Sequence, residues 1–302
     1  MSNSLICPPY LKKGDKIAII AMASKINRSD LDFSINIMQN EWGVEVLVGD
    51  SVNSAYFDFA GNDDVRRFDF QKMLDDSSVK AIFSARGGYG SSRFIDQINF
   101  DNFVQNPKWI IGFSDITAVH GKVQALGYQS IHGPMPKTFS RDYPSVERLQ
   151  DFLFGSFPDY KISSHPMNQL GRAEGQIVGG NLCLLAHSIG SQSELNTEGK
   201  ILFIEDISEY LYNIDRMMVQ LKRAGKLDNL AGLIVGDFSD TKDNDSPFGK
   251  GVEEIVLEHT ASYNYPICFG FPAGHESVNF PLLLGRNTTM KISIDTVELI
   301  FD

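Results

Sequence analysis

Cysteines and long apolar runs are both scarce in this sequence of 302 residues. The three cysteines, Cys7, Cys183 and Cys268, are odd in number and widely spaced, which argues against a disulfide framework and favours a reducing compartment. The most apolar stretches, such as 17–23 and 230–235, are far shorter than the ~20 residues that a membrane-spanning helix needs. Residues 1–9 have no basic start followed by an apolar core, the pattern of a secretory signal. These absences predict a cytoplasmic protein.

Basic residues are also outnumbered. Lys and Arg total 27 against 38 Asp and Glu, a formal net charge of −11. A nucleic-acid partner requires a basic face for its phosphates, and an anionic membrane surface attracts the same kind of charge, so we expect neither partner. Hydrophobic residues make up 42% and charged residues 22% of the chain, the balance of a folded globular protein rather than of a disordered one.

Short apolar runs alternate with amphipathic stretches in the first half of the chain. Continuous apolar strands separated by helices indicate a parallel α/β sheet with helices on both faces. We predict strands at 16–21, 44–48, 79–84 and 109–113, and helices at 29–38, 63–74 and 116–126. We expect Ser29-Asp30 to cap the first helix, which has Leu31, Ile35 and Met38 on one face. The apolar residues of the second helix are Val65, Phe68 and Met73.

The pattern weakens between about 140 and 172, where prolines interrupt it, and a second α/β unit follows. We therefore predict an N-terminal domain over 1–140, a linker over 141–172 with a short helix at 146–154, and a C-terminal domain over 173–302. In this second unit we expect strands at 175–180, 201–205, 230–237 and 267–271, helices from 181 and around 214–221, and a half-exposed strand or hairpin at 290–301.

A candidate nucleophile lies in Gly112-Phe113-Ser114-Asp115, between a predicted strand and a predicted helix. A tight turn at this point exposes a serine hydroxyl at the end of the sheet, beside the free N–H groups that begin the helix. The match to the hydrolase elbow pattern is partial, because Ile116 stands where its second glycine belongs. Spacing alone favours the alternative, in which Ser114 only caps the helix.

A glycine-rich loop, Arg86-Gly87-Gly88-Tyr89-Gly90, follows the third predicted strand. Its glycines permit backbone shapes that other residues resist and allow a ligand to approach closely, although a plain tight turn fits the pattern equally well. A phosphate cradle fits poorly, because Arg93 stands where the dinucleotide motif has its third glycine and the lysine and hydroxyl of a P-loop are missing.

Acidic and basic candidates follow two later strands. Glu205 and Asp206 end an apolar strand, where they are either functional or, in the case of Asp206, cap a turn. His275 lies in a glycine-containing loop and is either a catalytic base or a solvated loop histidine. Metal binding is not expected, because the second histidine of the zinc helix pattern and paired cysteines are absent. Ser114, Glu205 and His275 together supply the residue types of a catalytic triad, in which chain order is free.

These segments resemble the ordered motifs of the LD-carboxypeptidases, a family of serine peptidases that also includes the microcin C immunity peptidases. The resemblance runs from about Lys16 to the C-terminus and covers nearly the whole chain. It is carried by Arg86-Gly87-Gly88-Tyr89-Gly90, Gly112-Phe113-Ser114-Asp115, Gly179-Gly180-Asn181-Leu182, Leu202-Phe203-Ile204-Glu205-Asp206, Ile214-Asp215-Arg216-Met217 and Ala273-Gly274-His275.

The resemblance implies a Rossmann-like or flavodoxin-like N-terminal domain with the nucleophile and a swivelling, barrel-like α/β C-terminal domain with the acid and base. By that resemblance Ser114 matches the nucleophile, Glu205 the acid and His275 the base, and the N–H groups of Gly88 and Asp115 match the oxyanion hole. It also implies a homodimer, and we expect neither a cofactor nor a metal. The implied substrate is the murein tetrapeptide, cut before its terminal D-alanine through an acyl-enzyme during cell-wall recycling. Ser208 stands where the family frequently has glycine, which we expect to affect loop shape rather than chemistry.

An exopeptidase must also recognise a free carboxylate. Arg86 and Tyr89 are the candidates for substrate binding, since arginine binds carboxylates bidentately. For Arg86 we favour the alternative of a structural ion pair beneath the glycine loop. Two other functions stay open: a microcin C immunity type peptidase or amidase acting on aminoacyl-nucleotide conjugates, and a two-domain ligand-binding module without catalysis.

Overall fold

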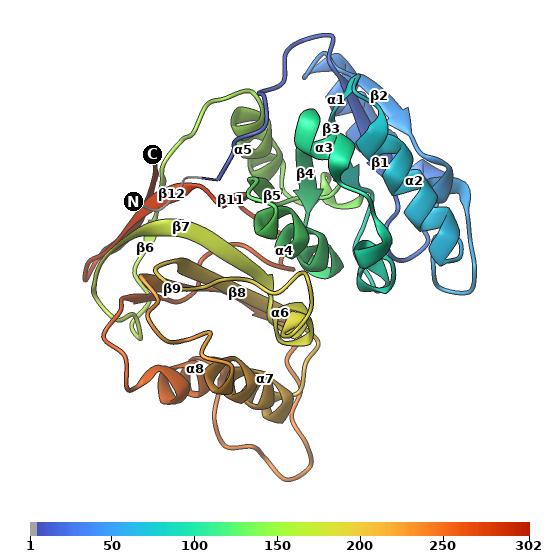
Figure 1. Cartoon of the computed structure of the whole chain (residues 1–302). Helices are drawn as coiled ribbons and strands as arrows, with labels where there is room; N and C mark the ends of the chain where they lie inside the picture. The colour runs from blue at the N-terminus through green and yellow to red at the C-terminus, as the bar shows by residue number, and fades with distance from the viewer. Residues whose placement is uncertain (1–4) are drawn as a thin grey trace.

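The computed structural model describes residues 5–302, so the first four residues of the predicted N-terminal domain lie outside the described range. Two sheets form the framework, one above the other in Figure 1. The first has six strands in the order β11-β5-β4-β3-β1-β2, and the second has seven in the order β10-β9-β8-β7-β12-β13-β6. The domain boundaries drawn from the sequence stay a prediction.

The first sheet confirms the expected α/β architecture. Its five parallel strands lie in the order β2-β1-β3-β4-β5, which is the flavodoxin-like order. The sixth, β11, comes from the second half of the chain and pairs antiparallel with β5. The strands are β1 (Lys16–Ile20), β2 (Glu45–Val48), β3 (Val79–Ser84), β4 (Trp109–Gly112), β5 (Ser130–His132) and β11 (Leu282–Leu284).

Helices α1, α2, α4 and α5 lie near the predicted positions, with two corrections, and α3 was not predicted. Ser29-Asp30 do not cap a helix but lie within a 3-10 turn, η1 (Arg28–Leu31), that precedes α1. Phe68 is exposed rather than packed on the core. The helices are α1 (Asp32–Asn40), α2 (Asp63–Asp75), α3 (Asp101–Gln105), α4 (Thr117–Ala125) and α5 (Tyr143–Leu153), with 3-10 turns η2 (Asp50–Asn53), η3 (Ser91–Arg93), η4 (Ile95–Gln97), η5 (Ser114–Ile116) and η6 (Pro136–Thr138).

Polar residues of α2 occupy buried positions that an apolar pattern cannot identify. Arg66 is 1% exposed and donates hydrogen bonds to the backbone oxygens of Met22 and Gly90. Asp69 is 3% exposed and accepts from the N–H of Ser51. Their hydrogen bonds offset the cost of burying charge, so α2 packs with this side inward and Phe68 faces solvent.

The second sheet combines four parallel strands with an antiparallel extension. β7 to β10 run parallel, and β12, β13 and β6 continue the sheet antiparallel. A bridge between Gln169 and Ile267 partly covers the edge strand β10. The elements are β6 (Tyr160–Ser163), β7 (Gly171–Asn181), β8 (Ile201–Ile207), β9 (Gly232–Ser239), β10 (Ile267–Cys268), β12 (Asn287–Ile292), β13 (Thr296–Phe301), α6 (Leu182–Ser188), α7 (Leu211–Arg223) and α8 (Val252–Thr260).

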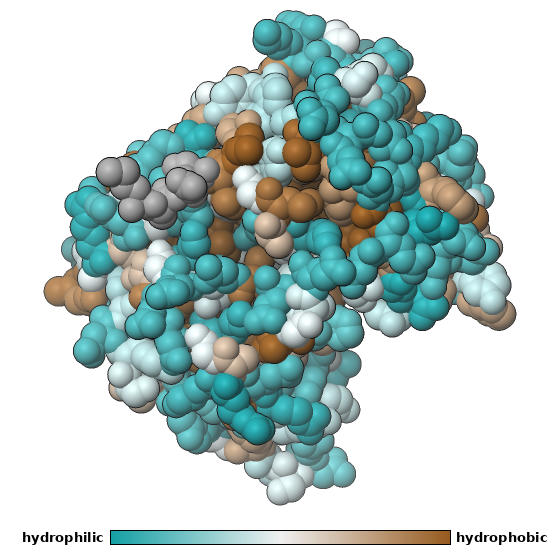
Figure 2. Space-filling view, in the orientation of Figure 1, coloured by the Kyte–Doolittle hydropathy of each residue, from teal (hydrophilic) through white to brown (hydrophobic). Residues whose placement is uncertain are grey.

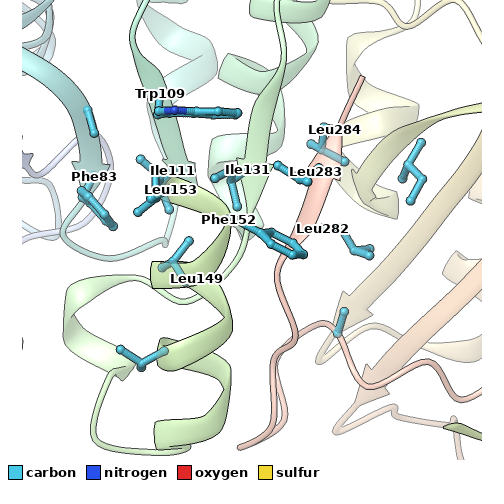
Figure 3. Packing of buried hydrophobic residues seen from close by; sticks show 14 of the residues in the cluster. Phe83, Trp109, Ile111, Ile131, Leu149, Phe152, Leu153, Leu282, Leu283 and Leu284 are labelled. Atoms are coloured by element: carbon cyan, nitrogen blue, oxygen red, sulfur yellow. The ribbon is translucent and has the colours of Figure 1, made fainter. Parts of the chain in front are cut away.

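One hydrophobic core joins the two sheets. It includes Phe83 and Trp109 of the first sheet and Phe203 of the second. Figure 3 shows α5, through Leu149, Phe152 and Leu153, beside strands of the first sheet and β11. A separate core lies between the second sheet and helices α6, α7 and α8. Because side chains of both sheets pack in one core, their relative position is set by packing rather than by a linker alone.

The face in Figure 2 is mostly hydrophilic, and hydrophobic residues gather in its upper central part. Within residues 5–302, no helix is both long enough and apolar enough to cross a membrane.

Candidate active site

Ser114 follows β4 on a sharp turn into α4. Its φ angle is +64°, in a region that few non-glycine residues adopt and that is common at functional sites. Phe113 occupies the cap position of η5 and Ile116 that of α4, so Ser114 does not hold the capping position that spacing favoured. Ser114 instead lines a cavity of about 220 Å³ together with His275 and Gly88. The turn thus places Ser114 at the wall of the cavity.

The glycine loop passes directly beside this serine. A Cβ atom on Gly87 would lie 2.9 Å from the Cβ and 3.0 Å from the Oγ of Ser114. Gly88 has a φ of +126°, and a Cβ there would lie 2.1 Å from the Oγ of Ser24. Among residues 5–302, the N–H groups of Gly88 and Asp115 have no hydrogen-bond acceptor. The glycines therefore permit a close approach that leaves two backbone donors free.

The side chain of Asp115 connects the serine turn to the glycine loop. Its carboxylate accepts hydrogen bonds from the N–H of Ser91 at 2.8 Å and from the N–H of Gly90 at 3.2 Å. The Oγ of Ser91 in turn donates to the backbone oxygen of Asp115 at 2.7 Å. Burial raises the pKa of Asp115, and these hydrogen bonds act against that rise. The loop and the turn are held as one unit.

His275, in the loop after β10, forms a hydrogen-bonded pair with Glu205, near the end of β8. The Nδ1 atom of His275 lies 2.7 Å from Oε2 of Glu205, whose side chain is fully buried. Burial lowers the pKa of His275, but the hydrogen bond and charge of Glu205, with the charge of Asp206, outweigh it and leave the pKa above its ordinary value. Nε2 of His275 has no hydrogen-bond partner among the described residues, so it is the nitrogen available to a substrate or to Ser114.

Asp206, the second acid of the strand, holds the residue that connects the two sheets, Asn181. Its carboxylate accepts from Nδ2 of Asn181 and from the N–H groups of Cys183 and Ile207, each within 2.9 Å. The backbone N–H of Asn181 donates to Oγ1 of Thr117, which begins the helix after Ser114, at 3.0 Å. Burial and then the charge of Glu205 raise the pKa of Asp206 to about 7. The acid does not simply cap a turn.

A further, partly buried acid lies near the histidine loop. Asp237, on β9, would contact a Cβ placed on Gly274, and burial followed by the charges of Glu276 and Glu205 raises its pKa to about 6. Of the carboxyl groups in this region, Glu205 and Asp206 are the ones whose charges favour the imidazolium form of His275.

The two residues predicted to bind substrate lie in different settings. Arg86 lines the cavity and donates to the backbone oxygens of Gly87 and Lys25, at 3.2 and 3.1 Å. No carboxylate within residues 5–302 forms an ion pair with it, so the structural ion pair that we favoured is wrong. Tyr89 is 55% exposed, is not among the residues that line the cavity, and packs its ring against Phe59.

Comparison with known proteins connects this geometry to a family. A model of the LD-carboxypeptidase N-terminal domain matches residues 17–133, and a model of the LD-carboxypeptidase C-terminal domain matches residues 174–290. The chain belongs to the LD-carboxypeptidase family. It is accordingly a hydrolase of the serine-peptidase type.

Individual relatives match along most of their length. The chain is 35% identical over 299 residues to a probable murein peptide carboxypeptidase of Bacillus subtilis, covering 97% of this chain and 93% of that protein. It is 27% identical to a murein tetrapeptide carboxypeptidase of Pseudomonas aeruginosa, with 91% and 93% covered.

Solved structures show the same architecture. The muramoyltetrapeptide carboxypeptidase from Oxalobacter formigenes superposes with a TM-score of 0.85 at 26% identity, covering 95% of this chain and 98% of that one. The microcin C7 self-immunity protein in complex with aspartyl sulfamoyl adenosine also gives 0.85, with 98% of each chain covered. At 20% identity, that likeness shows the fold alone.

Sequence reasoning missed cavity residues that follow β5. Lys137, Thr138 and Arg141 all line the cavity. β5 has only three residues, too few for a periodic pattern, so the loop after its carboxyl end was not recognised as part of the site. The available signal was its position: ligands of parallel α/β sheets bind beyond the carboxyl ends of the strands.

The backbone at Ser208 has an unusual conformation. Ser208 has a φ of +60°, in the region that favours glycine.

Within residues 5–302, no group of three or more His, Cys, Asp or Glu side chains is placed to hold a metal ion.

Proposed function

We propose that this chain is a serine LD-carboxypeptidase that removes the terminal D-alanine from murein tetrapeptides, with Ser114, His275 and Glu205 as its catalytic triad. The observation that carries the proposal is the Glu205–His275 hydrogen bond at the edge of the cavity that also holds Ser114. The names of the relatives from Bacillus subtilis and Pseudomonas aeruginosa support the substrate class.

In the first half of the reaction, the Oγ atom of Ser114 attacks the peptide carbonyl carbon and its proton passes to Nε2 of His275. Glu205 accepts the hydrogen bond from Nδ1, fixes the imidazole tautomer and stabilises the imidazolium. The C–N bond then breaks, His275 gives the proton to the leaving amine of D-alanine, and an acyl-enzyme on Ser114 remains.

In the second half, water attacks the acyl carbon, His275 takes its proton and returns it to Oγ of Ser114, and the shortened peptide leaves. In both halves the N–H groups of Gly88 and Asp115 stabilise the negative oxygen of the tetrahedral intermediate. Removal of one such donor typically costs about 3 kcal/mol of transition-state stabilisation. Their lack of an acceptor within the described chain supports this role.

The decisive experiment incubates the protein with murein tetrapeptide and follows release of D-alanine, with Ser114→Ala as the matched control. We expect release by the wild type and none above background by the variant. Equal release by both, or none by the wild type, contradicts the proposal. Aspartyl sulfamoyl adenosine is included as a second substrate, and hydrolysis of it alone would assign the chain to the microcin-type function instead.

The finer setting of the reaction also follows from the resemblance. We place the enzyme in the cytoplasm as a homodimer, where it acts on peptides released during cell-wall recycling. Size-exclusion chromatography with light scattering measures the mass of the protein in solution directly. A monomeric mass at micromolar protein concentration would contradict the dimer.

A further inference from the structure

Cationic side chains gather in and beside the catalytic cavity. Arg86, Lys137 and Arg141 line it, and its lining residues include no Asp or Glu. A larger hollow of about 590 Å³ shares Arg86 and Lys137 with this cavity and adds Lys25 and Arg28. This concentration of positive charge runs against the composition of the chain, whose formal net charge is −11. Arg86 and Lys137 line both spaces, so the two cavities are neighbours on either side of these side chains.

The positive charge at this junction is only weakly compensated. Arg86 donates to backbone oxygens and has no carboxylate partner within residues 5–302. The Nζ atom of Lys137 lies 3.7 Å from Asp30, and the Lys137 side chain is 37% exposed. The larger hollow holds four basic residues against two acidic ones, Asp30 and Asp58. Because their charge is only weakly compensated, the guanidinium of Arg86 and the ammonium of Lys137 are suited to bind a carboxylate ligand.

The position of His275 indicates which part of a peptide enters the larger hollow. A general acid must give its proton to the leaving amine, so the released amino acid lies on the His275 side of Ser114. Arg141 is on that side, and its Nη1 lies 3.5 Å from the backbone oxygen of His275. The larger hollow lies beyond Arg86, which is part of the glycine loop. Its size also suits the longer acyl part rather than one small amino acid.

We propose that the hollow lined by Lys25, Arg28, Arg86 and Lys137 is a subsite for the acyl part of an acidic peptide, with Arg86 and Lys137 binding a carboxylate on that part. The identity of the peptide rests on the proposed function, since murein peptides have acidic residues on the acyl side of the cleaved bond. The subsite selects substrate by charge, and it acts on binding rather than on bond cleavage.

Calorimetry with the Ser114→Ala variant tests this without turnover. The probes are murein tetrapeptide and the same peptide with its acyl-side carboxylates converted to carboxamides. We expect the carboxylate peptide to bind about 10- to 100-fold more tightly, the range of one or two charge-assisted hydrogen bonds. Adding either Arg86→Gln or Lys137→Gln to the Ser114→Ala variant should reduce the ratio of the two affinities about tenfold. Arg86→Lys should keep part of it, and Lys222→Gln, an exposed lysine on α7, should leave it unchanged.

Three results overturn the proposal: equal affinity for both peptides, an equal loss for both in the Arg86→Gln and Lys137→Gln variants, or no binding at all. Kinetics with Ser114 intact provide a second readout. Lys137→Gln should raise KM for the carboxylate peptide about tenfold and change kcat less than about twofold. If Ser114→Ala distinguishes the peptides but the wild type hydrolyses neither, the proposed reaction fails and the subsite stands.

Discussion

The N–H of Ser91 donates a hydrogen bond of 2.8 Å to the carboxylate of Asp115, across 24 residues of sequence. It fixes the glycine loop to the turn that bears Ser114, and so sets the spacing between the N–H groups of Gly88 and Asp115. In an oxyanion hole that spacing determines how well both donors meet one oxygen. The carboxylate of Asp115 therefore affects catalysis, although it forms no hydrogen bond with His275 or Ser114.

Asp115→Asn should lower kcat about 10- to 100-fold, because an amide NH₂ group opposes one of the two backbone donors and the loop shifts. KM for murein tetrapeptide should change much less. Steady-state kinetics measure both, and Asp96→Asn, on an exposed residue, is the control. A loss confined to KM would show that the loop does not position the oxyanion donors.

Gly87→Ala should also act on kcat. The added Cβ would lie 2.9 Å from that of Ser114, so the loop or the serine must move. Because a displacement of about 1 Å at reacting groups can cost on the order of 100-fold, we expect a loss of about that size. Gly251→Ala is the matched control, since its Cβ would meet nothing closer than 3.6 Å. Wild-type kcat in Gly87→Ala would rule out this close approach as a requirement.

Glu205→Gln should reduce kcat by about 1,000-fold or more, because a neutral amide neither stabilises the imidazolium nor selects its tautomer. The side chain is fully buried, so the folded state must be checked in parallel by circular dichroism. A folded variant with nearly full activity would remove Glu205 from the triad.

The loss of activity at acid pH, the acid limb of the pH profile of kcat/KM, should follow the protonation of His275. As a base the imidazole must be neutral, so kcat/KM rises with pH through its pKa, which lies above the ordinary 6.5. Asp206→Asn removes a negative charge that raises this pKa, so the limb should move to lower pH. Asp206 has a pKa of about 7, so its charge acts most fully above that pH. Asp245→Asn, on an exposed loop, should leave the limb in place, and an unmoved limb in Asp206→Asn would contradict the coupling.

Asn181→Ala should lower the free energy of unfolding by about 2 kcal/mol, through loss of the helix cap on Leu184 and of a hydrogen bond to buried Asp206. Urea denaturation measures the free energy of unfolding. The control is Asn36→Ala, at an exposed position of α1, which should change that free energy by less than about 0.5 kcal/mol. An equal effect of both substitutions would mean that the contact between Asn181 and the acid contributes little.

The sequence alone was sufficient for the parts of the fold that have strong local patterns. The apolar run at 79–84 is β3 without change of bounds, and 63–74 differs from α2 by one residue. Ser114, Glu205 and His275 were singled out because each follows an apolar strand, and strand ends are where such sheets bind ligands. The ordered motifs then indicated the family, which the comparisons confirmed.

Tertiary structure decided what local patterns do not encode. β5 and β11 have three residues each, and they form strands because β5 pairs with both β4 and β11 over the shared core. Arg66 is buried and Phe68 exposed because hydrogen-bond partners distant in sequence, such as Gly90, offset the cost of a buried charge. The same dependence governs the site: Ser114 and His275 lie far apart in the chain, and only the joined sheets bring them to one cavity.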